Sequence, residues 1–412
     1  MLKESKKLAQ QITIAMILAV IIGMILNVTG HSELVSYIAP IGTIFLKSLK
    51  MIIVPIVFCS IYLAMVNLGT PEELGSIGIK AIVYYFLTTA LAAFIGLIMV
   101  NLINPGDGVE LASKSLDTAL SAKLSAQKGL FATIMDVVMD AIPENIAKSM
   151  AEMKVLQIIV FAVFFGGISL YYKKDAEPFI KVVASFEKLN YALVHFIMKF
   201  APIGIFVLLV KVLAETGSAA LVGLGKYMAT VIIGLVVHAI ILVIVGGIRS
   251  GKGPMFVLKG LMSPMFTAFS TASSAATLPI TMASVTDNLG VEEKTANFVL
   301  PLGATINMDG TALYESVAVI FIAQATGFDL SISQQFIVFF TASLAAIGAA
   351  AIPGAGLITM SIVLSAVGMP LDGIALILAV DRILDMFRTA VNVLGDGIGT
   401  VVVDSFLRKR TT

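Results

Sequence analysis

Charged and amide side chains recur at helical spacing near the C-terminal end of the sequence, between Asp381 and Asp396. An α-helix turns by about 100° per residue. Asp381, Asp385, Arg388, Asn392 and Asp396 would therefore lie within an arc of roughly 80° on one face. Carboxylates bind cations or an ammonium group, and a guanidinium binds a carboxylate through two hydrogen bonds. The pattern is typical of a site for a small charged ligand.

The composition places this face inside a membrane. Of 412 residues, 58% are hydrophobic and 13% are charged, about half the charged share of a soluble domain. The sequence therefore predicts a polytopic membrane protein, in which a charge at the bilayer centre costs roughly 2.5–3.5 kcal/mol. The polar face must turn toward protein, water or a charged ligand. A net charge of +1 excludes a nucleic-acid footprint, and the single Cys59 excludes an internal disulfide.

Six apolar segments precede residue 253, and each is long enough to cross or enter a bilayer. They are residues 12–27, 38–68, 77–102, 130–172, 190–212 and 224–247, with the fourth segment broken. Basic residues concentrate in the cytoplasmic loops of membrane proteins. The following set would face the cytoplasm if an even number of spans separates the two ends: Lys3, Lys6, Lys7, Lys80, Lys173, Lys174, Arg249, Lys252, Arg408, Lys409 and Arg410. We therefore expect both termini in the cytoplasm.

Two later apolar segments are interrupted at their centres. Residues 254–285 contain the Ser-rich stretch 270–279, and residues 333–367 contain the Gly- and Pro-rich stretch 348–356. Each precedes a fuller span, residues 296–323 and 374–403. Irregular backbone at membrane depth needs protein or a water-filled cavity around it, and paired interrupted segments point to a transporter binding site. We predict an all-α fold with eight transmembrane helices and two re-entrant hairpins; two kinked ordinary helices are the alternative.

The span at 296–323 carries a break of its own. Gly310 follows Asp309 within an apolar run, and glycine there favours local unwinding that exposes backbone carbonyl groups. At helical spacing, Asn307, Thr311 and Glu315 would share one face and Asp309 would point to the other side. A helix N-terminus capped by Asp309 is the simpler alternative.

Broken helices offer two kinds of ligand group. The N-termini of half-helices attract anions, whereas unwound carbonyl groups with carboxylates coordinate hard cations such as sodium. Together with the C-terminal face, these groups suit an acidic amino acid. Arg388 would bind its side-chain carboxylate, Asp385 its amino group, and Asn392 with the hairpin tips its α-carboxylate. Asp309 and Asp396 would bind a cation, having no basic partner in the motif. A structural ion pair between Asp385 and Arg388 is the alternative.

Four motifs resemble the glutamate/aspartate transporter family, the dicarboxylate/amino acid:cation symporters. They are Asn307-Met-Asp-Gly-Thr311, the serine-rich tip ending Thr277-Leu-Pro279, Pro353-Gly-Ala-Gly356, and Asp385-x-x-Arg388-Thr-x-x-Asn392-x-x-x-Asp396. The resemblance covers essentially the whole chain. It implies a transporter rather than an enzyme, without an organic cofactor, that forms a homotrimer in the cell membrane. Residues 1–75 and 105–218 would form a scaffold domain, and residues 76–104 and 219–412 a transport domain that moves like an elevator.

The resemblance also implies roles for single residues. Substrate contacts would fall on Ser274, Thr311, Ile352, Gly356, Asp385, Arg388, Thr389 and Asn392. One sodium site would use Gly303, Asn307, Asn392 and Asp396. Another would use Tyr85, Thr88, Thr89, Asn307 and Asp309, and a third would use mainly the carbonyl groups of Thr305, Ala346, Ile347 and Ala349. Sodium would be the coupling ion.

The sequence departs from the family pattern in three ways. Some members have an arginine where this chain has Ala272 or Met386, and here Arg382 lies one turn before the binding aspartate instead. Glu315 stands where branches that also move a proton or potassium carry an acid, so it is a candidate proton carrier. Alanine also replaces common hydroxyl residues at positions 346 and 349, which matters little if carbonyl groups bind the ion.

The residues favour acidic amino acid symport over other functions. Asp385 argues against C4-dicarboxylates, which have no ammonium group, and Arg388 argues against neutral amino acids. An intramembrane hydrolase would need a base beside the serine tip, and none of the three histidines lies near it in sequence. Asp309 and Asp396 could form a catalytic dyad, but each has an asparagine at a spacing typical of a cation site. An anion channel could coexist with transport.

Overall fold

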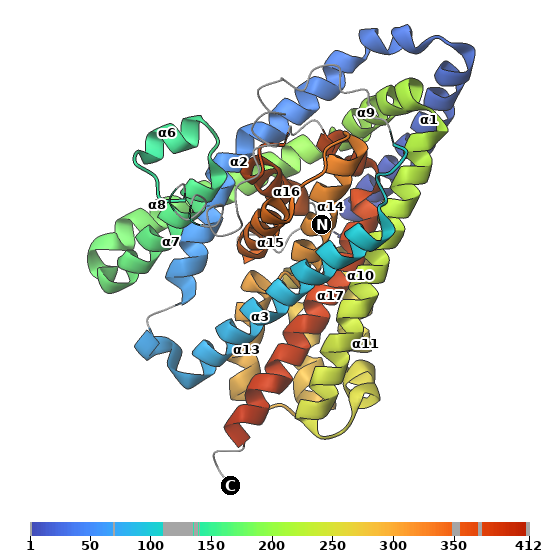
Figure 1. The fold of residues 1–412 in the computed structure, drawn as a ribbon. Helices are drawn as coiled ribbons and strands as arrows, with labels where there is room; N and C mark the ends of the chain where they lie inside the picture. The colour runs from blue at the N-terminus through green and yellow to red at the C-terminus, as the bar shows by residue number, and fades with distance from the viewer. Residues whose placement is uncertain are drawn as a thin grey trace.

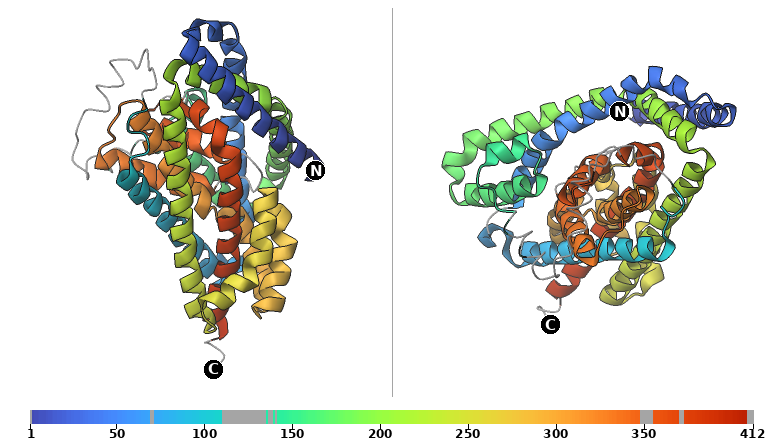
Figure 2. Two further views of the ribbon diagram at one scale, coloured as in Figure 1. Left: turned by 90° about the vertical axis from the view of Figure 1, so that its right-hand side faces the viewer. Right: turned by 45° about the horizontal axis from the view of Figure 1, so that its top comes forward.

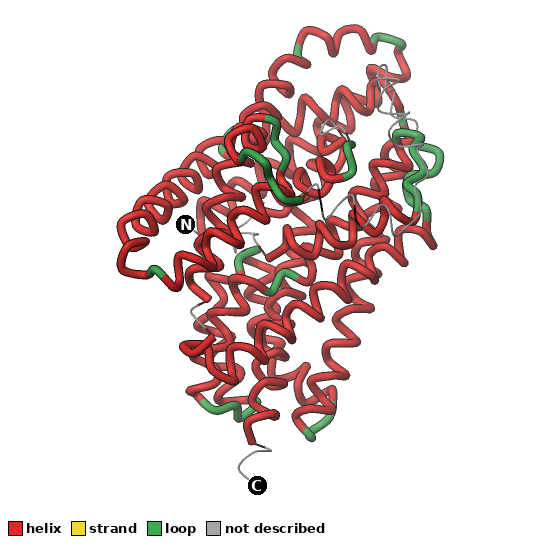
Figure 3. Tube along the Cα trace, turned by 60° about the vertical axis from the view of Figure 1, so that its left-hand side comes forward, coloured by secondary structure: helices red, strands yellow, loops and turns green. Residues whose placement is uncertain are grey.

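The computed structural model describes residues 2–68, 71–109, 135, 139, 141–347, 355–369 and 373–408. Their regular structure is helical throughout, and these residues contain no strand (Figures 1 and 3). The all-α class is therefore confirmed. Five stretches are long and apolar enough to cross a membrane: Gln10–Thr29, Ile77–Ile103, Leu221–Ser250, Glu293–Ala325 and Val380–Leu407. These helices identify an integral membrane protein.

The N-terminal half follows the predicted segments closely, with one exception. Its helices are α1 (Leu2–Thr29), η1 (Ser32–Tyr37), α2 (Ala39–Leu68), α3 (Pro71–Ile103), α6 (Ile146–Ala151), α7 (Val155–Tyr171), α8 (Lys173–Met198), α9 (Ala201–Thr216) and α10 (Ser218–Ser250). The span expected at 190–212 is not a single straight helix. The chain there bends by 57° between α8 and α9. Pro202 stands in the first turn of α9, where proline starts a helix readily because the missing N–H has no helical partner.

The C-terminal half contains the broken elements. Its helices are α11 (Pro254–Thr271), α12 (Ser274–Ala283), the π-helical turn η2 (Ser284–Asn288), α13 (Glu293–Ile306), α14 (Asp309–Ala325), α15 (Ile332–Ile347), α16 (Ala355–Ala366) and α17 (Ile374–Arg408). Both interrupted segments are pairs of short helices, as predicted. The break between α11 and α12 is short: Ala272 has a φ of 49°, and the Ser273 side chain accepts a hydrogen bond from the N–H of Ala276. The tip between α15 and α16 lies outside the described residues.

The predicted break between α13 and α14 is present, but it lies at Asn307 and Met308 rather than at Gly310, which is helical. Asn307 is extended, with φ −90° and ψ 99°, and Met308 is also non-helical, so α14 begins afresh at Asp309. The expected shared face holds for Thr311 and Glu315, which lie four residues apart in α14, and is wrong for Asn307, because helical spacing does not carry across the two non-helical residues. Every residue from Asp309 to Ala323 is buried, so α14 runs through the centre of the molecule.

The helices pack in two groups. Helix α1 packs on α9, and α2 packs on α7, α8 and α9. Helices α3, α10, α13 and α14 pack together with α17. In the right-hand view of Figure 2, the blue and green helices α1, α2, α7, α8 and α9 form an arc beside the orange and red helices. Helix α16 contacts α2 and α7, so the second hairpin lies between the two groups.

Candidate functional site

Helix α17 buries its polar face at the centre of the group formed by α3, α10, α13, α14 and α17. Asp381, Asp385, Arg388, Asn392 and Asp396 are each between 1% and 7% exposed. Helices α10, α11, α13 and α14 all pack against α17. These side chains therefore meet protein groups rather than lipid, as their charge requires.

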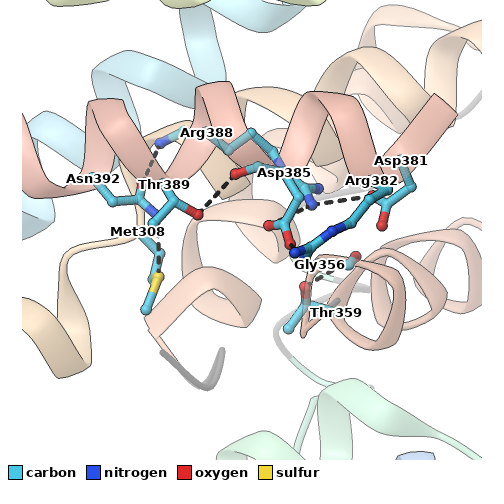
Figure 4. Close-up of polar contacts among 10 residues, drawn as sticks. Met308, Gly356, Thr359, Asp381, Arg382, Asp385, Arg388, Thr389 and Asn392 are labelled. Atoms are coloured by element: carbon cyan, nitrogen blue, oxygen red, sulfur yellow. Dashed lines mark hydrogen bonds and ion pairs between the residues drawn. The ribbon is translucent and has the colours of Figure 1, made fainter. Parts of the chain in front are cut away.

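Arg388 is the centre of a buried ionic cluster (Figure 4). Its Nη2 atom lies 3.0 Å from Oδ1 of Asp385 and 3.0 Å from Oδ1 of Asp381. Its guanidinium carbon lies 3.8 Å from the centre of the Tyr314 ring, a cation–π contact. Arg382 Nη1 lies 3.6 Å from the other oxygen of Asp385. The side chain of Arg382, one of the departures from the family pattern, therefore points toward the candidate site. Asp385 thus lies between two arginines.

The second hairpin covers the guanidinium. A Cβ placed on Gly356 would come within 2.4 Å of Arg388 Nη1, so only glycine fits against the charged group without a shift. The Thr359 hydroxyl donates to the carbonyl of Gly356 at 3.3 Å. Within the described residues, Nε and Nη1 of Arg388 have no hydrogen-bond partner. Helix α16 thus brings backbone groups directly to the predicted substrate arginine.

Asn392 links α17 to the break between α13 and α14. Its Oδ1 accepts a hydrogen bond of 2.8 Å from the N–H of Gly310, and its Nδ2 lies 3.3 Å from the sulfur of Met308 (Figure 4). One turn earlier, the Thr389 hydroxyl donates to the carbonyl of Asp385 at 2.7 Å. In this arrangement the Asn392 amide supports the broken helix, where the sequence suggested a contact to substrate.

The remaining predicted substrate residues lie around the same region. Thr311 is buried in the first turn of α14, and Ser274 is buried at the start of α12, which packs against α17. Ile352 lies outside the described residues. Of the third predicted cation set, Ala346 is buried in α15, whereas Thr305 is exposed and donates to the carbonyl of Pro301. Ala349 of that set also lies outside the described residues.

The first predicted cation set is assembled around Asn307. Its Nδ2 donates to Oδ1 of Asp396 at 2.9 Å and to the carbonyl of Asn392 at 3.1 Å. A Cβ on Gly303 would come within 2.5 Å of the Tyr85 hydroxyl and 2.8 Å of Asp396 Oδ1, so this glycine lies directly between them. The buried Oδ1 of Asn307 has no hydrogen-bond partner among the described residues. A buried carbonyl oxygen of this kind is suited to a cation.

The second predicted cation set centres on Asp309. Its Oδ1 accepts a hydrogen bond of 2.8 Å from the Thr89 hydroxyl of α3. Its Oδ2 lies 2.9 Å from Nε2 of His238 in α10, and both side chains are fully buried. The Thr88 hydroxyl donates to the carbonyl of Tyr85. The sequence predicted no basic partner for Asp309 within the motif, and the fold brings His238 to it from a distant helix.

The chemistry of these groups fits a hard monovalent cation. Among the described residues, no three His, Cys, Asp or Glu side chains gather as a set of metal ligands. The available groups are carboxylate, amide, carbonyl and hydroxyl oxygens, which suit sodium better than a transition metal. The arrangement also disfavours a hydrolytic dyad, because Asp396 bonds Asn307 while Asp309 bonds Thr89 and His238.

Glu315 lies two turns into α14 and is fully buried. Its carboxyl group has the Thr359 hydroxyl of α16 as a polar neighbour, and Arg388 is near enough to interact electrostatically. The candidate proton carrier therefore lies beside the candidate substrate site, on the side covered by the second hairpin.

Comparisons with known proteins show the family of this chain. Residues 8–406 match the model of the sodium:dicarboxylate symporter family. The chain is 34% identical to a proton/glutamate-aspartate symporter of Escherichia coli, over 98% of this chain and 93% of that protein. It is 36% identical to excitatory amino acid transporter 1 of Ambystoma tigrinum, over 95% and 82%. It is 34% identical to a proton/sodium-glutamate symport protein of Geobacillus stearothermophilus, over 97% and 94%. The chain belongs to the sodium:dicarboxylate symporter family.

Proposed function

We propose that this protein is a secondary active symporter that takes up glutamate or aspartate together with sodium ions and a proton. The observation that carries the proposal is the buried guanidinium of Arg388. It lies between two aspartates and the glycine backbone of a hairpin, and two of its nitrogens have no hydrogen-bond partner among the described residues. A carboxylate ligand would satisfy those donors.

The names of the relatives support the choice of substrate. Proteins similar over nearly the full chain are named as symporters or transporters of glutamate, aspartate or excitatory amino acids. In this chain Arg388 would bind the side-chain carboxylate and Asp385 the amino group of the substrate. Binding would exchange the internal contact between these two residues for contacts to the ligand. Because the exchange replaces one buried ion pair by others, it avoids leaving a buried charge unpaired.

Sodium would complete the sites at Asn307, Asp309 and Asp396. These residues come from the break between α13 and α14 and from α17, so a cation bound there would hold the broken helix against α17. The same break supplies Gly310, whose N–H bonds Asn392 beside the substrate residues. Cation binding and substrate binding would thus stabilise one arrangement of the backbone, which couples them. Glu315 would carry the proton.

The proposal extends to architecture. Eight transmembrane helices and two re-entrant hairpins would form each protomer of a homotrimer. The trimer would lie in the plasma membrane, with both termini of each protomer in the cytoplasm. The arc of α1, α2, α7, α8 and α9 would belong to the scaffold, and the group around α17 to the moving transport domain. Most helix contacts fall within these two groups, with α9 packing against α10 and α17 across the boundary, which supports this division.

Uptake into liposomes containing the purified protein tests the proposal. Sodium, proton and potassium gradients are imposed one at a time, and radiolabelled aspartate is measured inside. We expect accumulation against its gradient when sodium is higher outside. Unlabelled glutamate should compete, whereas succinate and serine should compete weakly, because succinate lacks the ammonium group and serine lacks the second carboxylate. Strong competition by succinate or serine, or uptake without sodium, would contradict the proposal. Aspartate equilibration without accumulation would indicate a channel.

A further inference from the structure

His238 is the buried polar group that the proposed transport cycle leaves without a role. It lies near the middle of α10, within a long apolar run, and its side chain is 0% exposed. Its Nε2 atom lies 2.9 Å from Asp309 Oδ2, whereas Nδ1 has no hydrogen-bond partner among the described residues. Burying a polar ring is costly unless its hydrogen bonds are made. The contact to Asp309 therefore offsets the cost of burying the imidazole at this position.

The two oxygens of Asp309 contact side chains of two different helices. The Thr89 hydroxyl of α3 donates to Oδ1 at 2.8 Å, and Nε2 of His238 in α10 lies within hydrogen-bond distance of Oδ2, at 2.9 Å. With a partner on each oxygen, the carboxylate plane is fixed relative to α3, α10 and α14. Each carboxylate oxygen still has a second lone pair. The hydrogen bonds thus orient Asp309 and leave it able to bind a cation.

Histidine and carboxylate partners behind a ligand are known to fix its orientation in metal sites, and their loss costs roughly 10–100-fold in metal affinity. We propose that His238 is a positioning residue for the sodium site at Asp309. The inference depends on the proposed function, because it assumes that Asp309 binds the coupling ion. His238 itself does not bind the ion; it holds Oδ2 of Asp309 so that the carboxylate faces Asn307 and Thr89.

The first experiment uses the unmodified protein. The chain has three histidines, so labelling histidine with ¹⁵N gives a simple solid-state NMR spectrum in liposomes, assigned with His31→Gln and His195→Gln. We expect sodium chloride, added without amino acid, to shift the Nε2 resonance of His238, whereas choline chloride at the same ionic strength leaves it in place. A His238 resonance that sodium does not move would overturn the proposal.

The second experiment compares the melting temperature of each variant in sodium chloride and in choline chloride. A ligand that binds the folded state raises this temperature according to its affinity. We expect His238→Ala to reduce the sodium-dependent increment, corresponding to a loss of roughly 10–100-fold in affinity. His238→Gln should restore most of it, because its amide N–H reaches about as far as Nε2. His31→Ala, at an exposed position, should leave it unchanged.

A purely structural histidine gives a different result. His238→Ala would then lower the melting temperature equally in both salts, and the difference in melting temperature between sodium chloride and choline chloride would stay at the wild-type value. That result would overturn the proposal. Asp309→Asn separates the proposal from its premise. If Asp309→Asn keeps the full increment, the sodium assignment at Asp309 fails. If Asp309→Asn reduces it and His238→Ala does not, only the role of His238 fails.

Discussion

The backbone of Gly356 lies directly against the guanidinium of Arg388. A Cβ at position 356 would meet Nη1 at 2.4 Å and Cζ at 2.9 Å. The contact joins the second hairpin to the central charge of α17. It means that any rearrangement of this hairpin changes the surroundings of the buried arginine.

Gly356→Ala should weaken substrate binding without unfolding the protein. Overpacking by a methyl group costs about 1–3 kcal/mol, and each 1.4 kcal/mol is tenfold in affinity. We therefore expect aspartate affinity to fall by roughly 5–150-fold, measured by calorimetry in saturating sodium. Gly225→Ala is the matched control, because a Cβ there meets no atom within 4 Å. Equal affinities in the two variants would show that the hairpin does not constrain the site.

Asn307→Ala should raise the sodium concentration needed for transport. The substitution removes the buried Oδ1 oxygen and the hydrogen bond of 2.9 Å to Asp396. We expect the half-saturating sodium concentration for aspartate uptake to rise by about tenfold or more. Asn101→Ala, at the end of α3 where the amide bonds Leu97 and Gln335, should keep the wild-type value. Unchanged sodium dependence in Asn307→Ala would remove Asn307 from the cation site.

Glu315→Gln should uncouple uptake from protons. The glutamine is nearly isosteric and can bond Thr359, but it cannot take up or release a proton. With sodium constant, an inward proton gradient should accelerate aspartate uptake by wild-type protein and leave the variant unaffected. Glu177→Gln, which alters an exposed pair with Lys181 on α8, should behave as wild type. Retention of the proton response in Glu315→Gln would assign the proton to another group.

Gly96→Ala should destabilise the protein through the packing of α3 on α14. A Cβ at Gly96 would meet the carbonyl oxygen of Leu313 at 2.6 Å, and backbone cannot move aside as a side chain can. We expect a loss of about 1–3 kcal/mol, seen as a lower melting temperature in detergent, with Gly225→Ala as the neutral reference. A melting temperature equal to that reference would show that the two helices are separated by more than the structure indicates.

Much of the fold follows from the sequence because Ser, Gly and Pro clusters interrupt apolar runs. Those clusters predicted both hairpins, whereas Asp309 and Gly310 within another apolar run predicted the break between α13 and α14 to within a few residues. The bend between α8 and α9 was not predicted because Lys199 is the single charged residue in the otherwise apolar stretch 196–210, and Pro202 alone does not distinguish a bend from a kinked span. The shared face of Asn307 and Thr311 was also wrong, since two non-helical residues change the phase of the helix.

The candidate site could be predicted only in part. The face of α17 could be read from helical spacing, because its polar residues lie on one continuous helix. The contact between His238 and Asp309 could not, because a lone histidine in an apolar helix carries no spacing signal. Nor could the ion pair of Arg388 with Asp381 be separated from the pair with Asp385. Both acids lie on the same face, and side-chain conformation decides which atoms meet.

The account depends most directly on Arg388 as the group that binds the acidic substrate. Calorimetric binding of aspartate to the purified protein in sodium, compared between wild type and Arg388→Ala, measures this role. Hydrogen bonds to charged groups contribute about 1.5–3 kcal/mol each, so losing two of them should lower aspartate affinity at least about a hundredfold, measured on the folded fraction of the variant. Near-normal aspartate affinity in Arg388→Ala would contradict the account.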